Sequence, residues 1–321
     1  MKQLNIFPHD VNFNFLRLRG VAFTMSVLLI LTSIGAVAFN GFNFALDFTG
    51  GTVTELRFDK PVDIDDARAR LAEAGYGGAE VLSFGSGNDL LVRLQSEEEG
   101  GDAAADANSR TAQAITAAVS TPDNPGQVMR SDFVGPQVGK ELALNGIWAV
   151  IFVVVGFLLY ISMRFEKKFA IAAVIASLQD VTIVTGWFAL SGHEFDLTVL
   201  AGILSVLGFS INDTIVVFDR IRDNFRTMRA DPETIINTSI NQTLSRTVIT
   251  SVVAFLTVLA LYLYGGGSLR GMAESQMIGV VIGTLSSIFV AAPLLTLGFL
   301  KVTKQDLMPK ARNEEALARR P

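Results

Sequence analysis

The chain of 321 residues contains no cysteine and only two histidines. The absence of cysteine excludes disulfide bonds and metal sites with thiolate ligands. His9 and His193 both fall outside the long apolar segments, and the sequence assigns a role to neither. Any folded part of this chain outside a membrane must therefore be held together by packing.

Charge is also scarce, because charged residues make up 18% of the chain and hydrophobic residues 50%. With a mean hydropathy of +0.42, the chain is too apolar for an ordinary soluble globular protein. A helix rises 1.5 Å per residue and the hydrocarbon core of a bilayer is about 30 Å thick, so a span needs about 20 apolar residues. Six segments meet this length: Val21–Phe39, Leu142–Met163, Phe169–Leu190, Leu197–Phe218, Thr247–Tyr264 and Gln276–Phe299.

Basic residues gather at one set of segment ends, which the positive-inside rule assigns to the cytoplasm. This predicts that both termini are cytoplasmic and that residues 40–140 lie outside. That outer stretch holds 8 Lys and Arg against 16 Asp and Glu, so the overall net charge of −5 hides a basic inner side and an acidic outer part. The basic residues at the inner ends are Lys2, Arg17, Arg19, Arg164, Lys167, Lys168, Arg220, Arg222, Arg226 and Arg229, with Lys301, Lys304, Lys310, Arg312, Arg319 and Arg320 in the tail.

The first segment has a second interpretation as a signal peptide. Arg17 and Arg19 precede an apolar run that ends in Ala36-Val37-Ala38, which resembles a cleavage site. The run is longer than the apolar core of a usual signal peptide. We therefore interpret it as an uncleaved span.

The outer stretch predicts a small α+β domain. Period-two alternation marks strands, and Asp63 or Asp65 can cap the first helix. The order βαββαβ is that of a ferredoxin-like fold. The expected elements are strands at Thr52–Phe58, Glu80–Phe84, Leu90–Gln95 and Gln127–Val134, with helices at Ile64–Ala74 and Ala104–Ser120.

No motif in this domain is catalytic, since it lacks histidine, cysteine, a nucleophile motif and a phosphate-binding loop. The acidic link Glu97–Asp102 is interpreted as a solvated loop, and strand addition of an extended peptide to a sheet edge stays open. The sequence thus predicts a membrane protein with six transmembrane helices and one ferredoxin-like domain. Its expected parts are residues 1–40 (N-terminus and first span), 41–140 (outer domain), 141–300 (five-helix bundle) and 301–321 (basic tail).

Two aspartates, Asp180 and Asp213, fall inside the predicted spans, and Arg246 directly precedes the fifth. Counted along the helix, Asp180 lies about 17 Å from the cytoplasmic end of its span, near the middle of the membrane. Asp213 and Arg246 lie roughly 24 and 27 Å from the outer face, at nearly one level, and about 11 Å from the level of Asp180. An ion pair between Asp213 and Arg246 would offset the cost of both charges in hydrocarbon. Direct transfer of a proton between the two carboxyl groups is not expected without intervening water.

Each of these residues also has a structural interpretation. Arg246 can reach the cytoplasmic headgroups, Asp213 can be an uncharged hydrogen-bond donor between helices, and Asp180 can stay protonated. The neighbouring Asn212 and Gln179 are interpreted as interhelical hydrogen-bonding groups. Gly279 and Gly283 form a GxxxG pattern that predicts a close helix contact.

Five segments carry a resemblance to a known family. The combined pattern resembles the SecF family, the smaller subunits of the SecDF accessory complex of bacterial protein export, and it covers nearly the whole chain. The first of these segments also occurs in the partner subunit SecD. The segments are Asp47–Gly51 (DFTGG), Phe195–Thr198, Gly208–Thr214, Phe218–Arg222 and Asn241–Thr247.

This resemblance implies a half-transporter of the resistance-nodulation-division superfamily, completed by SecD, in the bacterial cytoplasmic membrane. Such a complex couples proton flow to the release of unfolded preproteins from the SecYEG translocon, with protons as the coupling ion and no cofactor. The family's functional carboxylate falls on Asp213, its arginine on Arg246 and its third-span aspartate on Asp180. Gln179 and Phe209 stand where the family is expected to have histidine and tyrosine.

The resemblance also implies that the linkers at both ends of the outer domain transmit motion. Asp47, Gly50 and Gly51 are expected to form a hinge, because glycine turns the backbone without strain.

Three other functions remain to be weighed. An intramembrane aspartyl protease needs two aspartates at similar depth in a GxGD context, whereas Asp213 lies in the sequence SINDT. A small-molecule exporter would require the chain to form homodimers. A passive scaffold for SecD would use the same polar groups for structure alone. Because the GxGD context of the protease is missing, the chain is not expected to be a hydrolase.

Overall fold

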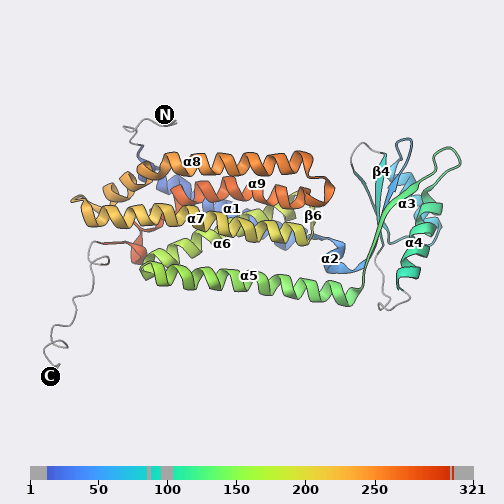
Figure 1. Cartoon of the computed structure of the whole chain (residues 1–321), viewed down its shortest axis with the longest axis horizontal. Coiled ribbons are helices and arrows are strands. Elements are labelled where there is room, and N and C mark those ends of the chain that lie inside the picture. The colour runs from blue at the N-terminus through green and yellow to red at the C-terminus, as the bar shows by residue number, and fades with distance from the viewer. Residues whose placement is uncertain (1–12, 85–87, 95–103, 304–305, 307–321) are drawn as a thin grey trace, which may run out of the picture. The chain divides into compact units, whose positions relative to one another are not determined.

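The protein is described by a computed structural model that covers residues 13–84, 88–94, 104–303 and 306. His9, the acidic link Glu97–Asp102 and most of the basic tail lie outside these residues. The chain divides into two compact units, one made of residues 1–43, 150–193 and 198–321 and the other of residues 44–149 and 194–197. Figure 1 gives the element labels used below.

The described residues contain six helices that are long and apolar enough to cross a membrane, as the sequence predicts. Five of them enclose a predicted span with its proposed ends. Helix α8 begins well before the predicted Thr247, because Asp231 caps it by accepting a hydrogen bond from the backbone N–H of Thr234. The helices are α1 (Arg19–Asn40, preceded by η1, Phe15–Leu18), α5 (Pro136–Arg164), α6 (Lys167–Ser191), α7 (Leu197–Thr227), α8 (Pro232–Tyr264) and α9 (Gly267–Ser286).

The predicted bounds of the last span, Gln276–Phe299, are wrong. Helix α9 starts earlier and gives way to a π-helical turn, η2 (Ser287–Ala291), and then to α10 (Ala292–Leu294) and η3 (Gly298–Leu300). Pro293 lacks a backbone N–H and cannot continue a regular ladder of hydrogen bonds, so the helix widens and then ends here. The apolar run beyond Pro293 made the helix look longer than it is.

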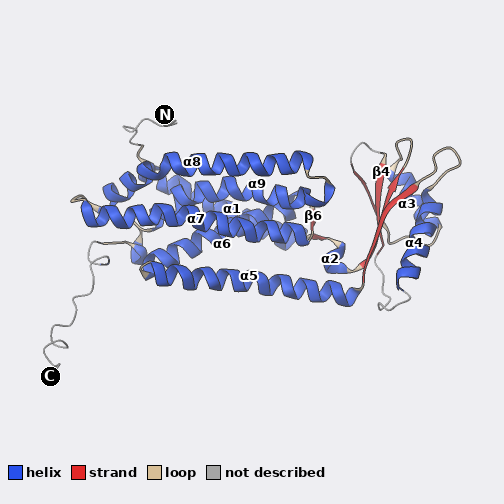
Figure 2. Ribbon diagram, viewed as in Figure 1, coloured by secondary structure: helices blue, strands red, loops and turns tan. Residues whose placement is uncertain are grey.

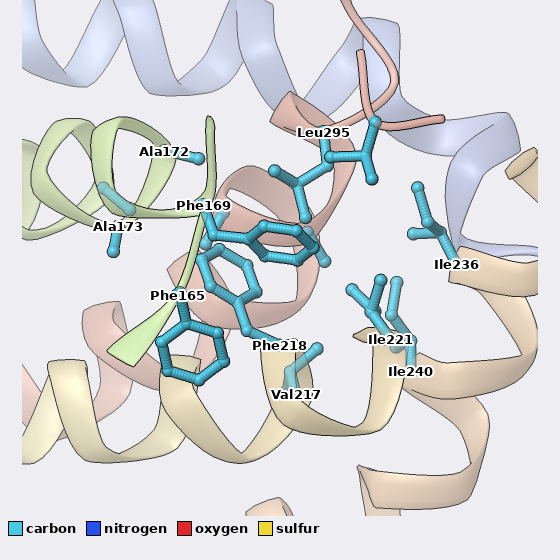
Figure 3. Packing of buried hydrophobic residues seen from close by; sticks show 14 of the residues in the cluster. Phe165, Phe169, Ala172, Ala173, Val217, Phe218, Ile221, Ile236, Ile240 and Leu295 are labelled. Atoms are coloured by element: carbon cyan, nitrogen blue, oxygen red, sulfur yellow. The ribbon is translucent and has the colours of Figure 1, made fainter. Parts of the chain in front are cut away.

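A cluster of buried side chains holds α6 against α7. The Phe169 and Phe218 rings meet edge to face with centroids 5.2 Å apart, and Phe165 packs against both (Figure 3). Ile221 on α7 and Ile236 on α8 extend the cluster and are fully buried. This packing fixes the two helices that carry the predicted carboxylates.

The α+β domain has the predicted ferredoxin-like topology. Its sheet has the order β3-β4-β2-β5 with every pair antiparallel, and α3 and α4 pack against it (Figure 2). Asp63, not Asp65, caps α3 by accepting from the N–H groups of Asp65 and Asp66. The core between sheet and helices contains Leu56, Leu71, Leu90 and Ile115, all fully buried. The elements are β2 (Gly51–Arg57), α3 (Ile64–Glu73), β3 (Glu80–Phe84), β4 (Asp89–Leu94), α4 (Ala104–Val119) and β5 (Gln127–Val134).

Candidate functional site

Asp180 on α6 lies in the interior of the helical unit. Its exposed fraction is 0%, and Ser210 Oγ on α7 donates a hydrogen bond of 2.5 Å to its Oδ2. Ser286 on α9 also faces this carboxyl group. Asp180 Oδ1 and Ser286 Oγ are both buried, and neither has a hydrogen-bond partner of regular geometry among the described residues. Asp180 thus has one carboxyl oxygen, Oδ2, bound by α7.

Asp213 on α7 is 5% exposed and is surrounded by hydroxyl groups. Ser287 Oγ, on η2, donates to Asp213 Oδ2 at 2.7 Å and also lies 2.9 Å from the carbonyl oxygen of Thr284. Thr247 on α8 is buried and contributes a second hydroxyl beside the carboxyl group. Two elements, η2 and α8, therefore supply hydroxyl groups to one buried carboxyl group on α7.

The adjacent residues Ser286 and Ser287 connect the two carboxyl groups. Successive residues of a helix point about 100° apart, so one serine faces Asp180 on α6 and the next faces Asp213 on α7. The pair sits where α9 passes into its π-helical turn, and such turns often mark functional sites. Sequence reasoning missed both serines, although two hydroxyl residues in a row inside an apolar span were a visible signal.

Asp180 and Asp213 are closer in level than helix counting predicts. Ser210, which binds Asp180, precedes Asp213 by three residues on α7, a rise of about 4.5 Å. The predicted separation of about 11 Å was obtained from backbone positions counted from the assumed ends of the spans. It did not include the length of the side chains. A route between the carboxyl groups through Ser286 and Ser287 is therefore short.

Arg246 does not complete the ion pair that the sequence suggests. Its side chain is exposed on α8, and none of the ion pairs among the described residues joins it to Asp213. Counting gives the level of a residue but not the face of the helix: the exposed Arg246 lies near enough for its charge to act on Asp213, but the two side chains do not meet in an ion pair. Asn212 is likewise exposed, whereas Gln179 is buried and accepts a hydrogen bond from Ser26 on α1, as an interhelical group should.

The close packing of α9 on α7 confirms the contact that the GxxxG pattern predicts. A Cβ atom on Gly279 would lie 2.1 Å from Val206, and one on Gly283 would lie 3.1 Å from Ser210 Cβ. Only glycine allows α9 to approach α7 this closely. The same approach brings Ser286 and Ser287 to the carboxyl groups.

The predicted hinge residues form a compact turn. Asp47 lies in α2 (Leu46–Thr49), and its Oδ2 accepts a hydrogen bond of 3.0 Å from the N–H of Leu197, the first residue of α7. Gly50 and Gly51 have φ angles of 71° and 123°, which side-chain-bearing residues rarely adopt. Gly139 at the start of α5 packs on this turn, since a Cβ there would lie 3.0 Å from the backbone nitrogen of Gly50.

Arg93 is a second link to the same region, and sequence reasoning missed it. It projects from β4, its side chain is only 9% exposed, and it pairs with Glu194 of β6 (Glu194–Phe195) and, at 3.6 Å, with Glu80. Burial raises the pKa of Glu194, and the positive charge of Arg93 offsets this only in part. The sequence around Arg93 does not show that its side chain is buried, because the loop that covers it comes from a distant part of the chain.

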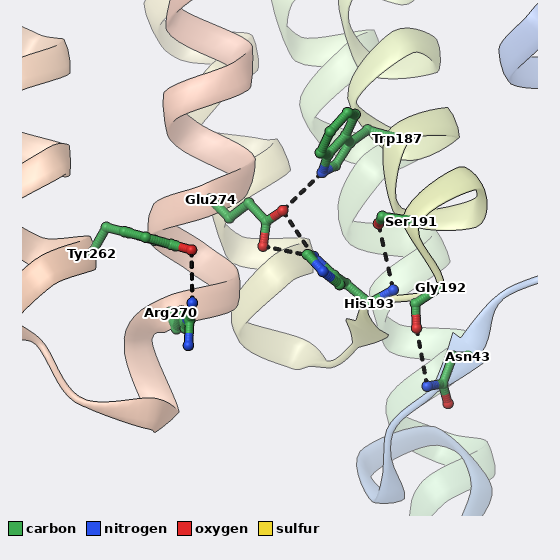
Figure 4. A network of polar contacts seen from close by, with 8 residues as sticks. All are labelled: Asn43, Trp187, Ser191, Gly192, His193, Tyr262, Arg270 and Glu274. Carbon is green, nitrogen blue, oxygen red and sulfur yellow. Dashed lines mark hydrogen bonds and ion pairs between the residues drawn. The ribbon is translucent and has the colours of Figure 1, made fainter. Parts of the chain in front are cut away.

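A polar cluster joins α6 to α9 near the end of α6 (Figure 4). Glu274 on α9 accepts a hydrogen bond of 2.8 Å from Trp187 Nε1, and His193 Nδ1 lies 2.8 Å from the same oxygen. Nearby, Arg270 donates to the hydroxyl of Tyr262. The sequence assigned no role to His193, and here it holds the carboxylate of Glu274.

Comparison with known proteins places these residues in a family. The family model "Protein export membrane protein SecD/SecF, C-terminal" matches residues 114–300, and the "SecD/SecF GG Motif" matches residues 35–62, which contain the glycine turn. The protein translocase subunit SecF of Pseudomonas aeruginosa is 42% identical over 92% of this chain and 94% of its own. The chain belongs to the SecF family. SecF of Vibrio alginolyticus is 41% identical over 97% of this chain and 96% of its own length.

Solved structures agree with the SecF assignment. The crystal structure of SecDF from Thermus thermophilus, a translocon-associated membrane protein, superposes with a TM-score of 0.78 at 36% identity and covers 89% of this chain. A SecDF structure in a super-membrane-facing form gives a TM-score of 0.64 at 35% identity and covers 90% of this chain. The chain spans 38% and 39% of those two SecDF chains. It is thus a multi-pass bacterial membrane protein of the Sec protein-transport pathway, with the predicted SecDF-like fold.

Proposed function

We propose that this SecF chain pairs with SecD and uses the proton motive force to promote preprotein translocation at the SecYEG translocon. The observation that supports this most is the pair of buried carboxyl groups, Asp180 and Asp213, on adjacent membrane helices and next to one serine pair. An intramembrane carboxyl group is costly and is typical of proton pathways. The basic segment ends favour a topology with both termini in the cytoplasm and the α+β domain outside.

The energy available is sufficient for such a role. A proton that crosses a potential of 100 mV releases about 2.3 kcal/mol, before any pH gradient is added. Moving a two-state equilibrium from 1:99 to 99:1 requires about 5.5 kcal/mol. Three protons per cycle at this potential would therefore suffice to drive the bundle between two conformations.

The proton is proposed to act first at Asp213. When Asp213 is ionised, it holds the hydroxyl hydrogen of Ser287 and, through it, the π-helical turn. Protonation removes the charge, so the charge-assisted hydrogen bond to Ser287 becomes a weaker neutral one and the hold of η2 on α7 loosens. Arg246 is the proposed counter-charge of Asp213 in a conformation in which Asp213 is ionised, so protonation also loosens that pair, and Asp180 is the second proton site. The turn at Asp47, Gly50 and Gly51 carries the motion to the α+β domain.

The test is proton-stimulated export in inverted vesicles that contain the chain assembled with SecD. Asp213→Asn and Arg246→Ala are expected to abolish the stimulation by the proton motive force while assembly with SecD stays normal. Asp219→Asn is the matched control, because Asp219 is exposed on the same helix and pairs with Arg164 and Arg222. Normal stimulation in both Asp213→Asn and Arg246→Ala would show that the two residues are structural and favour a passive scaffold.

A further inference from the structure

The loop between α6 and α7 is held by groups that lie outside both helices. The N–H of Ala45 donates to the carbonyl oxygen of Phe195 at 2.9 Å, and Asp47 binds the N–H of Leu197. Arg93 of β4 pairs with Glu194 in the same loop. The loop is therefore bound both to the glycine turn and to the sheet of the α+β domain.

Because Arg93 is buried, loss of its ion-pair partner would be costly. All three guanidinium nitrogens of Arg93 are buried and form no hydrogen bond of regular geometry among the described residues, so the ion pairs with Glu194 and Glu80 must compensate its lost hydration. Glu80 is the weaker partner, since it lies 3.6 Å away and its side chain is 49% exposed. Loss of Glu194 would leave a buried charge poorly paired.

The α6–α7 loop joins the two helices that carry the buried carboxyl groups, so movement of either helix reaches the loop. Asp180 lies on α6 and Asp213 on α7, and the loop is the direct connection between them. If protonation shifts α7 against α6, the loop must move or deform. A cavity of about 90 Å³ adjoins Arg93, lined by Phe44, Leu46, Thr49, Gly50, Glu80 and Leu94, so the guanidinium group has room to follow.

We propose that Arg93 is a positioning residue that ties β4 of the α+β domain to the α6–α7 loop, so that the domain follows movements of the two proton-carrying helices. This inference rests on the proposed function and adds to it a side-chain route beside the covalent linkers. In this arrangement the backbone can rotate at Gly50 and Gly51, and the Arg93–Glu194 ion pair keeps β4 attached to the α6–α7 loop.

Because Glu194 titrates, the ion pair between Arg93 and Glu194 depends on pH. The charged groups that face Glu194 are Arg93, Asp196 and Glu80, and burial together with the two carboxylates raises the Glu194 pKa. As the pH falls through this raised pKa, Glu194 loses its charge and the ion pair with Arg93 weakens. Acidification on the side of the domain is therefore expected to reduce coupling in the unmodified protein and to change it less in Glu194→Gln.

The experiment measures proton-stimulated export in the complex with SecD. Arg93→Gln and Glu194→Gln are expected to lower the stimulated component by roughly 2- to 30-fold, the range typical of residues that couple distant sites. Arg93→Lys keeps the charge and is expected to retain most of the stimulation. Arg57→Gln is the matched control, since Arg57 pairs with Asp89 at 2.8 Å in the same sheet, away from the loop.

Two further measurements separate failure of this inference from failure of the proposed function. If Asp213→Asn abolishes stimulation while Arg93→Gln and Glu194→Gln keep the full level, the inference is wrong and the proposed function stands. If Asp213→Asn keeps full stimulation, the proposed function is wrong. A nitroxide label at Ser191→Cys reports loop mobility without transport, and unchanged mobility in Arg93→Gln would also overturn the tie between loop and sheet.

Discussion

Ser287 has one hydroxyl hydrogen and two acceptors within reach. When Asp213 is ionised, the hydrogen points to Oδ2 at 2.7 Å; when Asp213 is protonated, its own hydroxyl can donate to Ser287, which then turns to the carbonyl of Thr284 at 2.9 Å. The same serine satisfies both protonation states. A residue with this property lowers the cost of cycling a buried carboxyl group.

Replacing Ser287 should therefore impair the proton cycle. Ser287→Ala removes a hydrogen bond to a charged group, worth about 1.5 to 3 kcal/mol, and is expected to reduce proton-stimulated export by about tenfold or more. Ser287→Thr keeps the hydroxyl and should retain activity. Ser177→Ala is the control, since the Ser177 hydroxyl is buried without a partner among the described residues. Equal activity of Ser287→Ala and the unmodified chain would exclude this role.

Trp187 offers a spectroscopic view of the polar cluster around Glu274. The chain has only two tryptophans, so a Trp148→Phe background isolates the emission of Trp187. Glu274→Ala removes the acceptor of the indole N–H and should shift the emission to shorter wavelengths. His193→Ala leaves that hydrogen bond in place and should shift it less. An unchanged spectrum in Glu274→Ala would show that the hydrogen bond does not form in solution.

At the scale of elements, the contact between α7 and α9 determines the geometry of the site. Gly279 has no room for a Cβ beside Val206, so Gly279→Ala is expected to cost about 1 to 3 kcal/mol of stability through overpacking. Val206→Ala in the same chain should recover part of this loss. Gly156→Ala on α5 is the control, because no atom lies within 4 Å of its added Cβ. Thermal unfolding in detergent measures all three.

The sequence predicts elements well where one periodicity dominates. The strands and helices of the α+β domain follow from alternating Thr54, Leu56 and Phe58 and from the spacing of Ala67 and Leu71, because burial on one face imposes that pattern. The end of α9 could not be predicted from hydropathy, since the apolar run continues past Pro293 while the helix does not. The local sequence pattern predicts that an element exists. Where the element ends depends on backbone geometry, as at Pro293.

The candidate site is predictable only in part, for physical reasons. A carboxylate in an apolar span stands out because of its cost, and this alone identified Asp180 and Asp213. Serine costs little in a helix, so Ser286 and Ser287 carried no comparable signal. Arg93 and Glu194 are far apart in the chain and meet only through the tertiary fold. For Arg246, the side of the helix that it faces depends on packing, which depth counting ignores.

At the scale of the whole molecule, the exposed Arg246 on a membrane-spanning helix is expected to be covered by a second protein. A charged side chain in a spanning helix costs about 2.5 to 3.5 kcal/mol at the centre of a bilayer, and burial against a second protein can supply a counter-charge. The chain has no cysteine, so Arg246→Cys is a unique target for a membrane-permeant maleimide. We expect SecD to protect this position. Tyr264→Cys, 87% exposed at the end of α8, should react equally with and without SecD.

The strand order of the α+β domain has a mechanical consequence. Gly51, Arg93 and Val134 lie on three adjacent strands at one end of the sheet, where Gly51 pairs with Val134 and Val53 pairs with Arg93. All three residues thus lie within two positions of the same end of the sheet. Seven strand residues extend about 23 Å, so a rotation of about 10° at this end moves the opposite end by about 4 Å. A small rotation at this end of the sheet therefore becomes a displacement of several ångströms at the opposite end of the strands.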